Sequence, residues 1–336
     1  MGDFMKKILP LVACSLLAFS LVACNGGSND ASAKAPEASS SSVEVSDDLK
    51  SGEYETPTKE ESQTLLASLV AALQADENLS TAFGSIYTSI GEAAMANEDI
   101  KGVIADCEEF SEGMEDILAS SADTASESLN INLDEISILD DKENGVEAKI
   151  YNADLSLKAS SDIDDKVPSQ TVGVKGDVDA SVSLKVDLEK AADKVAKDSV
   201  LKQVYASASV AGNMDVVQTT KLTTATDTDT NVSVIYSGSL NVSADAGITA
   251  SFLVDNTAGI LVVNGNAKIN LDDSSLNNVK EIAELLEYLE GNLIFTIYDV
   301  NGTKIDSQTV ELKDFINGML SGGNTDSNPD SESDSE

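Results

Sequence analysis

Most of the chain from Leu129 onward alternates between apolar and polar residues. In the clearest stretch, every second position from Val172 to Leu188 is apolar or glycine, and most positions between them are Lys, Asp or Ser. Successive side chains of a strand point to opposite faces, so this pattern predicts a strand with one buried face. Similar runs predict further strands at about 129–139, 145–159, 204–224, 232–254, 259–271, 292–300 and 303–311.

The predicted strands are long and their apolar face is built from small residues. Several runs exceed twelve residues, whereas strands of ~5–6 residues are the most common. One apolar and one polar face per strand is typical of antiparallel sheets, and Asn301-Gly302 is a hairpin-turn signal between the last two strands. Such a sheet must curl, accept helices on its apolar face of mostly Val, Ala and Gly, or leave a cavity. We therefore expect a long-stranded, curved antiparallel sheet.

Residues 58–120 have the 3.6-residue period of helices instead. Thr58 and Glu61 form a capping-box signature after Pro57. Apolar stripes at helical spacing follow in three stretches, about 65–73, 79–94 and 100–118, and we expect these helices to cover the sheet. Two more helices are predicted near 189–203 and 276–290, inserted between strands. The fold class is thus α+β, with a helical segment at 57–128 and a sheet domain at 129–320.

Both ends of the chain lack the apolar content of a folded domain. Residues 24–56 are rich in Ser, Ala and acidic residues, which predicts a disordered tether. For 32 residues after Cys24 the typical reach would be roughly 30 Å. Residues 321–336 are mostly Ser, Asp, Asn and Gly, which predicts a disordered acidic tail.

The first 24 residues have the order of an export signal. Lys6 and Lys7 precede an apolar run from Ile8, and the run ends in Leu21-Val22-Ala23-Cys24. The four residues ending in Cys24 resemble the lipobox of bacterial lipoproteins. The earlier Leu11-Val12-Ala13-Cys14 has too short an apolar run before it to serve as one. The alternative is an ordinary signal peptide in which Cys24 is a plain thiol.

The lipoprotein resemblance implies where the protein resides. It implies that residues 1–23 are removed as a signal peptide and that Cys24 is the lipid-attachment site, acylated on its thiol and its amine. Two or more acyl chains hold a protein stably on a membrane. We therefore expect a lipid-anchored protein of the bacterial cell envelope. Asn25, where an Asp would favour inner-membrane retention, favours the outer membrane if the host has two membranes.

Composition excludes several kinds of chemistry. The formal net charge is −38, and the chain contains no His, Arg or Trp, so we expect no nucleic-acid partner. A Ser-His-Asp triad and a His-based zinc site are impossible. The Asp227-Thr-Asp229-Thr-Asn231 stretch begins like a calcium loop but has Val232 where that loop needs Gly. We therefore expect no enzyme activity, no catalytic residue, no metal and no cofactor.

Cys107 is the one cysteine outside the predicted signal peptide and lipid-attachment site, and the small-residue face of the sheet leaves two functional hypotheses. Cys107 lies on an apolar helical stripe and is interpreted as a small buried hydrophobe. The first hypothesis is a non-enzymatic envelope lipoprotein that acts as a display, binding or scaffolding module for an envelope protein. The alternative is a carrier that binds a lipid or other hydrophobic ligand between sheet and helices. A cavity of several hundred Å³ would favour the carrier over the scaffold.

Overall fold

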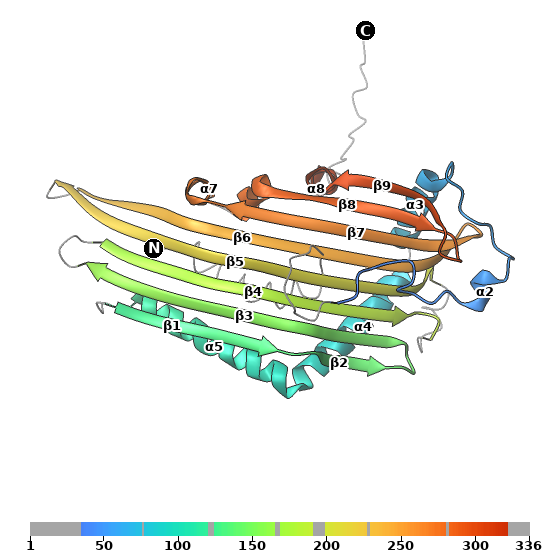
Figure 1. Cartoon of the computed structure of the whole chain (residues 1–336), viewed down its shortest axis with the longest axis horizontal. Coiled ribbons are helices and arrows are strands. Elements are labelled where there is room, and N and C mark those ends of the chain that lie inside the picture. The colour runs from blue at the N-terminus through green and yellow to red at the C-terminus, as the bar shows by residue number, and fades with distance from the viewer. Residues whose placement is uncertain are drawn as a thin grey trace, which may run out of the picture.

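A computed structural model describes residues 35–75, 77–119, 124–164, 169–190, 199–226, 229–279 and 282–321. In these residues the chain forms a curved, open antiparallel sheet of nine strands with a few helices, as Figure 1 shows. The sheet order is β1-β3-β4-β5-β6-β7-β8-β9, and β2 also pairs with β3, beyond the end of β1. The prediction of an α+β fold dominated by an antiparallel sheet is confirmed.

The strands follow one another along the sheet, so that neighbours in sequence are mostly neighbours in space. The bounds are β1 Thr124–Leu133, β2 Ile136–Asp141, β3 Val146–Asp164, β4 Ser169–Asp187, β5 Leu201–Thr226, β6 Asp229–Val254, β7 Thr257–Leu271, β8 Leu289–Tyr298 and β9 Lys304–Glu311. The two central strands, β5 and β6, are each 26 residues long. The strand expected at about 129–139 is two strands, β1 and β2, and the other strands expected from the alternation are present. A turn at Asn301-Gly302 joins β8 to β9, with Gly302 at φ 82°.

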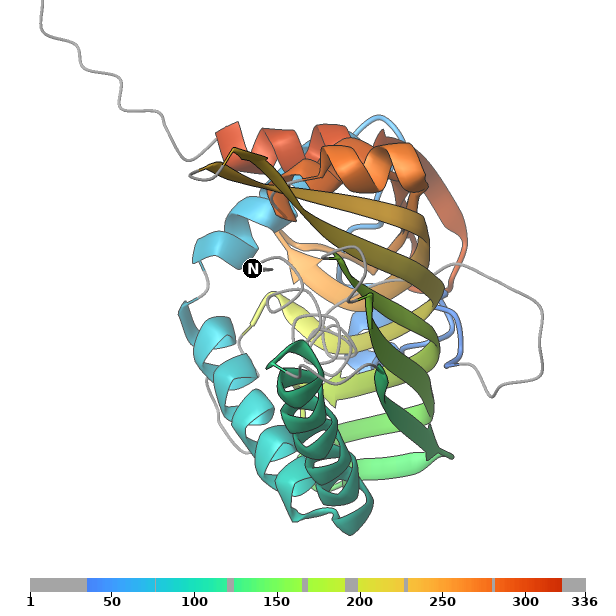
Figure 2. The ribbon, with the colours of Figure 1, turned by 90° about the vertical axis from the view of Figure 1, so that its left-hand side faces the viewer.

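Helices cover the concave face of the sheet, as Figure 2 shows. Their bounds are α3 Ser62–Ala75, α4 Glu77–Ala96, α5 Glu98–Ala119, α7 Asp273–Asn278, the 3₁₀ helix η1 Ile282–Tyr288 and α8 Leu312–Ser321. Leucines of α3 pack with Phe252 of β6 and Val186 of β4, both of which are completely buried. Apolar residues of α5 pack with those of β1 and β3. The core therefore lies between these helices and one face of the sheet.

The opposite, convex face is covered in part by residues 35–56, which we call the strap. The strap contains the short helix α2, Asp47–Lys50. Its apolar side chains at 38, 43, 45 and 49 are buried against Tyr205 of β5 and against β7. Tyr205 follows Val204, which faces the helices, so the strap and the helices lie on opposite sides of the sheet. The prediction of a disordered tether is thus wrong for residues 35–56, while 24–34 lie outside the described residues.

Three other predictions need correction. The helix expected near 189–203 is wrong for its last residues, because strand β5 begins at Leu201. Residues 191–198 lie outside the described residues. The helix expected at 276–290 is two short pieces, α7 and η1. Helix α3 begins at Ser62 rather than after Thr58, and the Thr58 hydroxyl donates to the Glu61 carboxylate at 2.5 Å.

Candidate functional site

An apolar cavity of about 270 Å³ lies between the helices and the concave face of the sheet. Its walls come from α4 and α5 on one side and from strands β1 to β6 on the other. Figure 2 shows these two helices lying across the hollow of the curved sheet. The volume is close to the lower bound of ~300 Å³ for ligand pockets in proteins.

Alanines in the sheet create the cavity by shortening the side chains of its floor. Ala208 of β5 pairs with Val182 of β4 on one side and with Ala246 of β6 on the other. In the next row Ala206 lies between Leu184 and Ile248. Close packing would require large side chains over this central stretch, and alanines leave their volume unfilled. Alanines of all four adjacent strands β3, β4, β5 and β6 line the cavity, so the small side chains that leave it open come from four separate stretches of the sequence.

A β-bulge in β3 changes which residues of this strand face the helices. The register of β3 against β4 shifts between Ile150 and Asn152. Before the shift, Ala148 packs against Ile90 of α4, and after it Leu155 packs with α5. Even-numbered residues of β3 therefore face the helices before the bulge, and odd-numbered residues face them after it. The sequence contains this phase change, but reading 145–159 as one uniform strand missed it.

The helical wall of the cavity is apolar but incompletely covered. Ile90, Ile100, Val103 and Cys107 of α4 and α5 line it. Tyr87 on α4 lines it with 62% of its surface exposed, and Ile248 on the floor is 45% exposed. A large aliphatic side chain that is nearly half exposed on the covered face of a sheet indicates an accessible hollow rather than a closed core.

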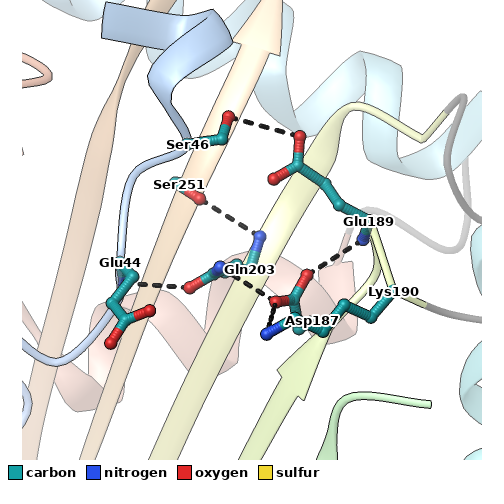
Figure 3. Close-up of polar contacts among 7 residues, drawn as sticks. All are labelled: Glu44, Ser46, Asp187, Glu189, Lys190, Gln203 and Ser251. Carbon is teal, nitrogen blue, oxygen red and sulfur yellow. Dashed lines mark hydrogen bonds and ion pairs between the residues drawn. The ribbon is translucent and has the colours of Figure 1, made fainter. Parts of the chain in front are cut away.

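A polar cluster on the other side of the sheet fixes the strap, and Figure 3 shows it. Gln203 of β5 is its centre: its side-chain oxygen accepts from the backbone N–H of Glu44 at 2.9 Å. Its side-chain nitrogen donates to Asp187 at 3.1 Å, and its backbone N–H donates to the hydroxyl of Ser251 at 3.1 Å. Gln203 is buried, so these bonds satisfy polar groups that would otherwise be desolvated without partners.

The charged members of this cluster are also paired. The Asp187 carboxylate forms an ion pair with Lys190 at 3.0 Å and accepts from the backbone N–H of Glu189 at 3.1 Å. The hydrogen bond that the Lys190 ammonium donates to the Asp187 carboxylate is the main reason that the pKa of Lys190 is raised. Ser46 of the strap donates to Glu189 at 3.3 Å. Because the carboxylate is held by several donors, the cluster is a structural joint rather than a reactive centre.

Tyr205 adds a further link between sheet and strap. Its hydroxyl donates to the carbonyl oxygen of Pro36 at 2.7 Å, and Thr249 donates to that of Ser39 at 3.0 Å. Burial raises the pKa of Tyr205 to about 12. Close to these contacts, Gly247 lies directly beneath Ala38 of the strap.

The residues singled out from the sequence fall as follows. Cys24, the expected lipid-attachment site, and Asp227 lie outside the described residues. Cys107 is half-buried and lines the cavity, which the helical stripe could not show. Within the described ranges, no group of three or more acidic or cysteine residues could hold a metal ion. Nor is any helix of the described part long and apolar enough to cross a membrane.

Comparison with known proteins gives no relative. No family model matches the chain, and neither a curated protein nor a solved structure matches it.

Proposed function

We propose that this protein is a lipid-anchored lipoprotein of the bacterial cell envelope that carries a small hydrophobic ligand in the cavity between its helices and its sheet. The observation that supports the carrier function is the apolar cavity of about 270 Å³, with the exposed side chains of Ile248 and Tyr87 on its walls. A closed core would have supported the scaffolding hypothesis instead. Support for the anchor comes from the sequence alone, namely the order of residues 6–24 ending in Cys24.

The physical basis of binding is burial of apolar surface. Transfer of apolar area out of water contributes about 25 cal/mol per Å². A preformed apolar hollow gains this free energy without first opening a packed core. The sheet fixes the floor through the pairing of β4, β5 and β6, whose register does not shift beside the cavity, so the ligand would meet a rigid wall on one side.

The test is to fill the cavity from its floor. Ala208→Phe places a ring into the hollow, since Ala208 lies on the floor between Val182 and Ala246. Ala211→Phe is the matched control: it lies three residues further along β5, and its side chain therefore points to the opposite face. Binding of the uncharged dye N-phenyl-1-naphthylamine is followed by fluorescence, and circular dichroism checks that each variant folds.

We expect the native protein and Ala211→Phe to bind the dye, and Ala208→Phe to bind it at least about tenfold more weakly, a loss of ~1.4 kcal/mol. Equal binding by folded Ala208→Phe would show that the dye occupies another site. Absence of binding to the native protein would refute the carrier function and leave the scaffolding hypothesis.

A further inference from the structure

The side chains that line the cavity carry no charge within the described part of the chain. Two charged residues contribute to its walls, Lys149 and Asp154 of β3. Lys149 follows Ala148, which packs on α4, so its side chain points to the convex face, where it pairs with Glu147 at 2.6 Å. Asp154 precedes the inward-facing Leu155 and accepts a hydrogen bond from Asn132. Both residues therefore line the cavity with their backbone.

The two helices over the cavity are strongly acidic. Helices α4 and α5 contain ten acidic residues and one lysine, Lys101, which pairs with Glu98 at 2.6 Å. Glu92 and Asp106 are exposed and are adjacent in sequence to lining residues of α4 and α5. The whole chain has a net charge of −38, so the field around the cavity is negative.

This charge distribution acts against an anionic ligand in two ways. A carboxylate or phosphate drawn into the hollow would be desolvated with no cationic side chain of the described residues to pair with it, which is costly. A headgroup left at the surface would still face the acidic helices and be repelled at short range. An uncharged headgroup has neither penalty. The size of the hollow, near the lower bound for ligand pockets, further suits one hydrocarbon chain better than two.

We propose that the cavity selects uncharged single-chain lipids and discriminates against anionic amphiphiles of the same chain length. This inference rests on the proposed carrier function and adds the chemical class of its ligand.

The experiment compares 1-dodecanol with dodecanoate, which share a chain and differ in the charge of the headgroup. Residues 24–336 with Cys24→Ser are used, so that no attached acyl chain competes, and each ligand displaces N-phenyl-1-naphthylamine at neutral pH. At about 0.01 M salt, where the Debye length is ~30 Å, we expect dodecanol to bind at least about tenfold more tightly. At about 1 M salt, with a Debye length of ~3 Å, the ratio should become smaller.

A charge-reversal pair tests the acidic helices directly. Glu92→Lys with Asp106→Lys should tighten dodecanoate binding several-fold and leave dodecanol unchanged. Asp47→Lys with Glu53→Lys makes the same change in net charge at exposed positions of the strap, on the convex side, and should tighten dodecanoate binding clearly less than the first pair does.

The outcomes separate the two proposals. If dodecanoate binds as tightly as dodecanol at low salt, the selectivity inference is wrong and the carrier function stands. If neither ligand displaces the dye and neither binds alone, the carrier function itself is wrong.

Discussion

Leu49 tests whether the strap is part of the folded domain or a loose tether. It lies in α2, only 4% of its surface is exposed, and it packs with apolar residues of β5 and β7. Leu49→Ala removes most of a buried side chain, a change that costs about 2–5 kcal/mol in protein cores. We expect about 2.5 kcal/mol, towards the lower end, because a peripheral segment can relax around the deletion more easily than a central strand.

Hydrogen exchange of strap amides measures this loss locally. The Glu44 amide donates to Gln203 and reports on docking of the strap. Opening should become roughly 60-fold more frequent in Leu49→Ala, since each ~1.4 kcal/mol is a factor of ten. Leu286→Ala is the control, because Leu286 is 40% exposed and should leave strap exchange unchanged. Docking of the strap would be refuted if the Glu44 amide of the native protein exchanged as fast as in an unstructured peptide and Leu49→Ala did not change that rate.

Three further predictions concern the strap and the anchor. A methyl group added by Gly247→Ala would lie 2.2 Å from Cβ of Ala38, so the strap should detach there and be cleaved faster by protease; Gly84→Ala, with nothing within 4 Å, should not change cleavage. Because burial raises the pKa of Tyr205 from 10.0 to about 12, the unfolded state loses this proton first. Stability should therefore be intact below about pH 10 and fall towards pH 12 in denaturant titrations, and Tyr205→Phe should reduce that fall. Cys24→Ser should release the protein from membranes on cell fractionation or leave it uncut; a membrane-bound protein of mature size would contradict the lipid anchor.

The strands could be predicted from the sequence because alternation is a local signal. Each strand of the sheet has one apolar face over many residues, and neighbouring strands are joined in sequence order. The bulge in β3 was also visible in principle, since the apolar residues change from even positions ending at Ile150 to odd positions beginning at Ala153. Treating the run as a single strand hid the shift.

The strap could not be found from composition. Residues 35–56 contain few large apolar side chains, and averaging over the segment gives the signature of disorder. What folds it is the surface it meets, namely Tyr205, the amide of Gln203 and the space above Gly247, all more than 140 residues away in sequence.

The cavity was foreseen only as a consequence of small residues on the apolar face. Its place depends on which alanines come into the same rows across neighbouring strands, as Ala208 and Ala246 do. Register between strands is set by the whole sheet, and no single run of sequence contains it. Helix α8 was not predicted, although Leu312, Phe315 and Ile316 have helical spacing, because no element was assigned between the last predicted strand, which ends at 311, and the acidic tail.

The measurement that tests the carrier function most directly is native mass spectrometry of residues 24–336 with Cys24→Ser, purified from cells without detergent. We predict a population with an additional mass in the range of a single-chain lipid, lost in Ala208→Phe and retained in Ala211→Phe. A protein with only its own mass, which stays so after titration with 1-dodecanol, would contradict the account of the cavity as a ligand site.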